Sequence, residues 1–288
     1  MYLHKSVVFV LATLVILVAF SAVVPATSAT ENMNEKLVSG GAISPLKKPT
    51  PPPPPPPPSS GDGVVKRYAV VVGISDYKAI SDLSYCDEDA SDWYTYLHAK
   101  GYSVIVLGDP TSNYPKFDGV AKESAVKSAI QNMVAVADGD DIIAFVSSGH
   151  GTTISGSQVL CMWDANAGEN GEDGFITDIE LKNLFAPAMA KIFIFLDHCN
   201  SGGMDEIMSN ANAANVYMTT TCGPRGYGYD VPQYQNGKWT YWFLEQGLVG
   251  QGFTTMESCF TWAFAQYNAR GQDAPMQFDG NTSVSFTL

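Results

Sequence analysis

The sequence predicts an α/β domain: a three-layer α/β/α sandwich around a central, mostly parallel, six-stranded sheet. The first observation is a set of apolar, β-branched runs in which apolar and polar residues do not alternate. Such runs are typical of strands that are buried on both faces of a parallel sheet. The second observation is that helical stretches separate these runs along the chain, which indicates βαβ crossovers.

Four runs predict the main strands, at residues 67–74, 103–107, 141–146 and 191–196. Shorter strand candidates lie at 158–163 and 215–220. Helices are predicted over residues 87–100, 122–137, 177–185 and 254–269. Because ligands bind at the carboxyl ends of strands in such sheets, we expect the functional residues directly after the predicted strands.

The N-terminal part differs in composition from the rest of the 288-residue chain. Residues 1–29 contain the basic Lys5, an apolar run over 7–24 and small residues near Ala29, which is the pattern of a secretory signal peptide. The alternative is an uncleaved membrane anchor formed by residues 7–24, because that run approaches the length of a bilayer span. On either interpretation the rest of the chain is secreted or extracytoplasmic.

Residues 30–63 are predicted to form a propeptide or linker. They include eight consecutive prolines, Pro51 to Pro58, which favour a stiff polyproline conformation over helix or strand. Lys47 and Lys48 lie just before the prolines. Residues 64–288 have one continuous globular composition and are predicted to form a single domain.

The charge and the cysteine content limit the classes of function. The formal net charge of −13 makes a nucleic-acid partner unfavourable. Five cysteines leave at least one thiol unpaired, and an unpaired thiol in an exported protein is a candidate reactive group. Their spacing does not match that of zinc ligands.

Two glycine-flanked strand ends carry the candidate catalytic residues. His150 follows the predicted strand 141–146 between Gly149 and Gly151, and Cys199 follows the strand 191–196. A thiol needs a nearby base to attack an amide, so the pairing of Cys199 with His150 predicts a nucleophile and its catalytic partner. The main-chain N–H groups of Gly151 and Cys199 are candidates for an oxyanion hole.

The other histidines are less suitable as the base. His4 lies in the signal segment, His98 lies in a predicted helix, and His198 is adjacent to Cys199 and so is expected to point the other way. Taken singly, His150 is also compatible with a turn residue and Cys199 with a small buried apolar residue. Together, at two strand ends, they favour catalysis.

Two motifs resemble those of a known family. Ser148-Gly149-His150-Gly151 and the segment 197–203 are similar to the His-Gly and Asp-x-Cys-x-Ser-Gly elements of metacaspases and related caspase-fold peptidases. Segments 83–90 and 247–264 extend the resemblance, which covers roughly residues 66–270. It implies a caspase-like sandwich and a cysteine endopeptidase with a Cys–His dyad, which requires no cofactor for its chemistry.

The resemblance also implies the substrate. The positions that match the metacaspase specificity pocket are Cys86, Asp89, Ser148 and Asp197. Two carboxylates can bind a guanidinium through charge-assisted, forked hydrogen bonds, so polypeptide cleavage after Arg is expected, with Lys second. The alternatives are a legumain-like peptidase that cuts after Asn and a catalytically inactive caspase-fold binding protein.

An acidic, glycine-rich segment over residues 164–178 is a candidate calcium site. Carboxylate oxygens are the ligands that Ca²⁺ selects, although simple solvation of the loop is the alternative. Calcium-dependent metacaspases bind calcium in this region together with an Asp shortly after the catalytic Cys, which implies calcium as a candidate activator here. The candidate ligands are Asp164, Asp173, Asp178 and Asp205.

Overall fold

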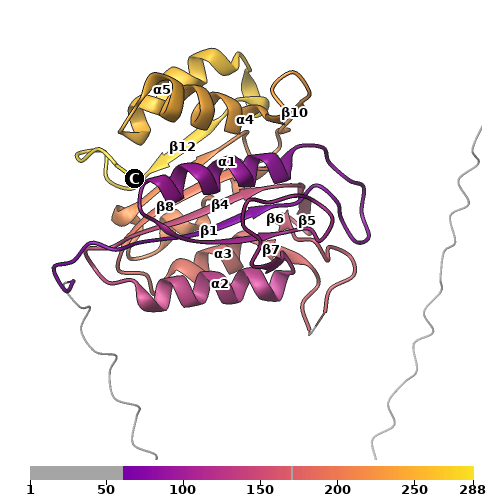
Figure 1. Ribbon diagram of the computed structural model, residues 1–288, viewed down its shortest axis with the longest axis horizontal. Helices are drawn as coiled ribbons and strands as arrows, with labels where there is room; N and C mark the ends of the chain where they lie inside the picture. The colour runs from indigo at the N-terminus through magenta and orange to yellow at the C-terminus, as the bar shows by residue number, and fades with distance from the viewer. Residues whose placement is uncertain (1–60, 170) are drawn as a thin grey trace, which may run out of the picture. The chain divides into compact units, whose positions relative to one another are not determined.

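The computed structural model describes residues 61–169 and 171–288. The predicted signal peptide and the proline run therefore lie outside the described residues. The central sheet has seven strands in the order β12-β9-β8-β4-β1-β2-β3 (Figure 1). These strands are β1 (Arg67–Gly73), β2 (Ser103–Gly108), β3 (Gly119–Val120), β4 (Ile142–Ser148), β8 (Lys191–Asp197), β9 (Val216–Thr220) and β12 (Met276–Asp279).

The sheet is parallel except at one edge, where β12 runs antiparallel to β9. It has seven strands where six were predicted. The additional strands are the two-residue β3, which is too short to produce a pattern, and β12, which lacks a continuous apolar run. The predicted strand at 158–163 forms outside this sheet, because an apolar pattern identifies a strand but not its pairing partners.

Helices cover both faces of the sheet and confirm the three-layer prediction. Figure 1 shows α2 (Glu123–Val136) and α3 (Asp178–Phe185) on one face. The other face carries α1 (Cys86–Ala99), α4 (Lys238–Thr240) and α5 (Met256–Tyr267), with the π-helix η4 (Tyr241–Gln251) between the last two.

The helical turns at 238–251 were not predicted. Trp239, Trp242 and Phe243 belong to residue types that favour strands, and Gly247 weakens a helix, so local preference opposes the structure that forms there. Packing stabilises the helical conformation instead, because Trp239 and Phe243 are fully buried against the sheet and their rings lie 5.3 Å apart. Tertiary burial thus outweighs a weak local propensity.

A second, antiparallel sheet lies beside the carboxyl end of β4. It consists of β5 (Gly151–Ile154), β6 (Ser157–Cys161) and β7 (Phe175–Thr177). The β5–β6 turn has Ser155 and Gly156 at φ of 52° and 95°, as a two-residue hairpin of this type requires. The remaining elements are short: η1 (Ser201–Gly203), η2 (Asp205–Ser209), η3 (Ala213–Asn215), η5 (Gly271–Asp273) and the hairpin β10 (Asp230–Val231) with β11 (Asn236–Gly237).

The register of the sheet places the predicted functional segments together. Gly73 at the end of β1 pairs with Ser148 of β4, and Ser148 pairs with Asp197 of β8. The carboxyl ends of the three neighbouring strands therefore meet at one edge. None of the helices in the described ranges is both long and apolar enough to span a membrane.

Candidate active site

His150 and Cys199 line the same small pocket at this edge, with a cavity of about 40 Å³. His150 follows β4 and Cys199 follows the adjacent strand β8, so the parallel pairing of the two strands brings the two residues together. The complete lining is Leu83, Cys86, Gly149, His150, Asp197, Cys199, Gly228, Tyr229 and Asp230.

The glycines that flank His150 allow close approaches that a side chain would prevent. A Cβ at Gly149 would lie 2.5 Å from the hydroxyl of Tyr77, and one at Gly151 would lie 2.1 Å from the carbonyl oxygen of Cys199. Both distances are shorter than any tolerable contact. The Gly-His-Gly sequence is therefore needed for the backbone of His150 to pass directly beside that of Cys199.

Two hydrogen bonds orient His150. Its Nε2 lies 2.9 Å from the carbonyl oxygen of Ser81, and its main-chain N–H donates to the hydroxyl of Tyr77 over 2.7 Å. Since a carbonyl only accepts, Nε2 must carry the proton, and this leaves Nδ1 of the neutral ring as the basic nitrogen. The ring also contacts that of Tyr77, with centroids 5.1 Å apart.

Cys199 is half-buried, and its Sγ donates to the carbonyl oxygen of Gly228 over 3.9 Å. Burial raises the pKa of the thiol, and the neighbouring carboxylate of Asp197 also raises it. The thiol is thus neutral at rest and needs a base to become a nucleophile. All five cysteines, including Cys199, are free thiols.

Two main-chain N–H groups beside Cys199 are available to a developing oxyanion. Gly151 of β5 lies opposite Leu160 of β6, and the Cys161 N–H donates to the His150 carbonyl. In an antiparallel ladder this arrangement makes Gly151 and Leu160 a non-hydrogen-bonded pair. The Gly151 N–H therefore points out of the β5–β6 ladder. In residues 61–169 and 171–288 no group accepts a hydrogen bond from the Cys199 N–H.

His198 points away from the thiol of Cys199, as predicted. It is buried, its Nδ1 lies 2.9 Å from the carbonyl oxygen of His150, and its Nε2 lies 2.8 Å from the hydroxyl of Ser147. Burial lowers its pKa to about 4, so the ring is neutral. It therefore links the backbones of the two strand ends. His98 is exposed on α1.

The four predicted specificity residues also come together. Cys86 and Asp197 line the pocket, whereas Asp89 and Ser148 lie buried beneath it and are joined by a 2.6 Å hydrogen bond from the Ser148 hydroxyl. The Gly237 N–H donates to Asp89 over 2.9 Å. Burial raises the pKa of Asp89 well above its usual range, and the charge of Asp197 raises it further.

The prediction missed Asp230, which adds a third carboxylate to this pocket. Its Oδ2 accepts the N–H groups of Ser84 and Tyr85 over 2.8 and 3.3 Å, just before α1 begins. The bonds bring the segment Gly228–Asp230 over the pocket, where all three of its residues line the cavity. Asp230 begins the strand β10, which has only two residues, so no sequence pattern indicates this position.

The candidate calcium ligands do not form one group. Asp164 accepts the Glu123 N–H, Asp178 accepts the N–H groups of Gln158 and Ile179, and Asp173 accepts the N–H of Phe175. Asp205 is exposed on η2. Within the described ranges, the acidic groups compact enough to hold a metal ion are Asp62 with Asp138 and Asp140, and Glu123 with Glu172 and Glu180. Neither contains a predicted ligand.

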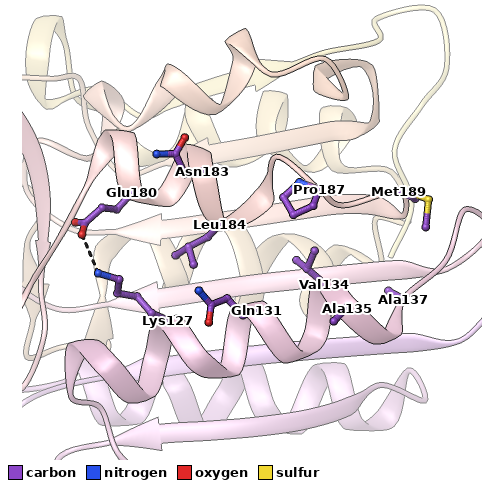
Figure 2. A pocket seen from close by; sticks show the side chains of 10 residues that line it. All are labelled: Lys127, Gln131, Val134, Ala135, Ala137, Glu180, Asn183, Leu184, Pro187 and Met189. Carbon is purple, nitrogen blue, oxygen red and sulfur yellow. Dashed lines mark hydrogen bonds and ion pairs between the residues drawn. The ribbon is translucent and has the colours of Figure 1, made fainter. Parts of the chain in front are cut away.

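The second of these groups already surrounds a cation. The ammonium of Lys127 lies 2.9 Å from Glu123, 2.8 Å from Glu172 and 2.8 Å from Glu180. Lys127 also lines a cavity of about 580 Å³ between α2 and α3 (Figure 2). Although this cavity is larger, its lining contains neither His150 nor Cys199, so the small pocket is the candidate active site.

Comparison with known proteins agrees with this geometry. A family model of the caspase domain matches residues 66–275. Caspase-1 from Spodoptera frugiperda superposes with a TM-score of 0.55 at 10% identity, over 76% of this chain and 90% of that chain. A structural-genomics target from Geobacter sulfurreducens superposes with a TM-score of 0.57 at 15% identity, over 74% and 92%. No curated protein sequence matches significantly.

The two structural likenesses show the fold, and the family model identifies the family because it spans well over half of the chain. The matched range contains β1, β4 and β8 with both residues of the dyad that the sequence predicted. The chain therefore has the caspase fold and belongs to the caspase-domain family, whose members are cysteine peptidases.

Proposed function

We propose that this protein is an exported cysteine endopeptidase that cuts polypeptides after arginine, with lysine second. The observation that carries the proposal is one pocket that holds the thiol of Cys199, the ring of His150 and the carboxylates of Asp197 and Asp230, with Asp89 directly beneath. Export and a propeptide role for residues 30–63 stay predictions from the sequence, as does activation by calcium.

The geometry supports a dyad mechanism. Nδ1 of His150 takes the proton from the Cys199 thiol, and the thiolate attacks the carbonyl carbon of the scissile bond. The resulting oxyanion is stabilised by the N–H groups of Gly151 and Cys199. The protonated His150 then gives its proton to the leaving amine, and a water molecule hydrolyses the thioester. The bond from Nε2 to the Ser81 carbonyl stabilises the charged ring during these steps.

The acidic pocket supports the choice of a basic residue before the cut. Two buried carboxyl groups with raised pKa values resist ionisation while the pocket is empty. A guanidinium removes that penalty because an opposite charge favours the ionised form. An Asn side chain has no charge to offer, so the arrangement favours Arg over the legumain-like alternative.

The pocket must enlarge to admit an arginine. A cavity of about 40 Å³ is far below the roughly 300–1,000 Å³ of typical ligand sites. The segment Gly228–Asp230 closes it, held by Asp230 at Ser84 and Tyr85 and by the contact of Gly228 with the Cys199 thiol. We expect an entering guanidinium to draw the Asp230 carboxylate away from these N–H groups and into a charge-assisted pair.

Hydrolysis of fluorogenic peptides that differ only in the residue before the cut tests the proposal. Arg, Lys, Asn and Asp peptides are compared on the full chain, with and without calcium, and on Cys199→Ala. Turnover of the Arg peptide that Cys199→Ala abolishes supports both the dyad and the specificity. Preference for Asn would favour the legumain-like alternative, and folded protein that cleaves none of the peptides would favour the inactive binding protein.

A further inference from the structure

A second cavity, of about 360 Å³, adjoins the acidic pocket at His150. His150 lines both cavities, whereas Cys199, Asp197 and Asp230 line only the acidic one. The second cavity extends from Gly151 along β5 to Ile154 and reaches Ile80, Cys161, Asn166 and Phe175.

The direction of the reaction determines which part of a substrate reaches this cavity. The residue before the cut enters the acidic pocket beside Cys199, and the oxyanion lies between the N–H groups of Gly151 and Cys199. His150 must protonate the leaving nitrogen. The leaving nitrogen therefore lies on the His150 side of the thiol. The residue that begins at this nitrogen, the first one after the cut, therefore passes His150 toward the second cavity.

The lining determines the chemistry of the side chain that fits. Phe175 and Cys161 form a buried floor, and Ile80 and Ile154 form apolar walls. Burial raises the pKa of the Cys161 thiol to about 12, so this residue is neutral and behaves as a small apolar group. The lining contains no Asp, Glu, Lys or Arg, in a protein with a formal net charge of −13.

We propose that this cavity is a subsite for the first residue after the scissile bond and that it selects a large apolar side chain such as Phe or Leu. The proposal rests on the proposed function in requiring a peptide bond to be cut at Cys199. It does not depend on which residue precedes the cut. The exposed polar residues of the lining, Ser81, Thr152 and Asn166, are suited to the peptide backbone that follows.

Quenched fluorescent peptides with the same residue before the cut and Phe, Leu, Gly, Lys or Asp after it test the subsite. We expect kcat/KM for Phe and Leu to exceed that for Gly by about tenfold or more, because the apolar side chain is buried. The peptides with Asp or Lys after the cut should have the lowest kcat/KM. Equal kcat/KM across the series would overturn the proposal.

A substitution that places a charge in the cavity tests whether this cavity determines the preference. Ile154 is 40% exposed at the rim, so Ile154→Glu should fold. Ile154→Glu should lower the ratio of kcat/KM for the Phe peptide to that for the Gly peptide by about tenfold. It should raise the ratio of kcat/KM for the Lys peptide to that for the Phe peptide by a similar factor. Ile179→Glu is the matched control, because Ile179 is 48% exposed on α3 and lines neither cavity. Ratios that Ile154→Glu leaves unchanged would overturn the assignment.

The two proposals can fail separately. If the enzyme cuts after Asn rather than Arg, the proposed specificity fails, and the same series is measured with Asn before the cut. If the folded protein cuts nothing, the proposed function fails, and calorimetry compares binding of short peptides that begin with Phe or with Gly. Stronger binding of the Phe peptide that Ile154→Glu abolishes would support the subsite, and equal binding would overturn it.

Discussion

The carboxylates of Asp89 and Asp197 converge on one point of the backbone. A Cβ at Gly237 would lie 2.6 Å from Oδ2 of Asp89 and 2.5 Å from Oδ2 of Asp197. Only a glycine allows β11 to pass between them, and its N–H donates to Asp89. The hairpin of β10 and β11 thus also borders the two acidic groups. The repulsion between these groups makes the empty pocket sensitive to pH.

We expect the substrate-free protein to lose stability as the pH rises from about 4 to above 6. Burial raises the pKa of Asp197 from 3.8 to about 6. Between these values the folded state holds a proton that the unfolded chain has lost, so ionisation at higher pH costs on the order of 3 kcal/mol. Asp197→Asn should remove this loss. Denaturant unfolding at pH 4.5 and 7.5 measures it, with the exposed Asp205→Asn as control; an unchanged pH dependence in Asp197→Asn would contradict the expectation.

The same ionisation should appear in the kinetics. An arginine substrate needs the charged form of Asp197, so its kcat/KM should rise as the pH passes through about 6. A peptide with Asn before the cut needs no charge there, so its profile should lack the contribution of Asp197 and rise less steeply than that of the arginine peptide. Parallel pH profiles of the two peptides provide the measurement, and identical profiles would count against a role of Asp197 in binding a cation.

Asp230→Asn should lower kcat/KM for arginine peptides by about tenfold to a hundredfold, because a charged hydrogen-bond acceptor is lost. The amide oxygen can still accept from Ser84 and Tyr85, so the fold around α1 should be kept. Cleavage of an Asn peptide should change little. A loss of the same size for both peptides would indicate that Asp230 supports the structure rather than the specificity.

Tyr77→Phe should impair catalysis through the backbone of His150. The Tyr77 hydroxyl accepts the His150 N–H, and its loss leaves a buried donor unsatisfied at a cost of about 1–3 kcal/mol. We expect a lower free energy of unfolding and about tenfold lower kcat with little change in KM. Tyr217→Phe is the control, since that hydroxyl bonds Gln277 on β12. An unchanged kcat in Tyr77→Phe would exclude this positioning role.

Lys127→Met should destabilise the protein by about 3 kcal/mol, because Glu123 is almost fully buried and would lose its partner. The loss should be largest at neutral pH and smaller near pH 4, because glutamates that have lost the Lys127 ammonium can take up protons there instead of staying charged. The control is Lys78→Met, which breaks a more exposed pair with Glu169 and should cost at most about 1 kcal/mol. Thermal unfolding of both variants at both pH values measures the losses of stability. Equal losses in the two variants would refute the buried-pair argument.

The fold class and the family follow from the sequence alone. Strands such as β4 and β8 are buried on both faces, so their unbroken apolar runs identify them without knowledge of their neighbours. The glycines around His150 and the residues after Cys199 mark two strand ends, and parallel strands present those ends at one edge. The resemblance to metacaspases then indicated four pocket residues that the structure brings together.

Tertiary structure alone decided the remaining features. Asp230 reaches the pocket from the two-residue strand β10, through bonds to backbone groups almost 150 residues earlier in the chain. The carboxylates of the 164–178 segment accept hydrogen bonds from separate main-chain N–H groups instead of gathering as one set, and residue types do not reveal that competition. The second cavity beside His150 exists because β5 and β6 fold back as a hairpin. These three features depend on contacts between residues that are far apart in the sequence, and a local sequence pattern does not show such contacts.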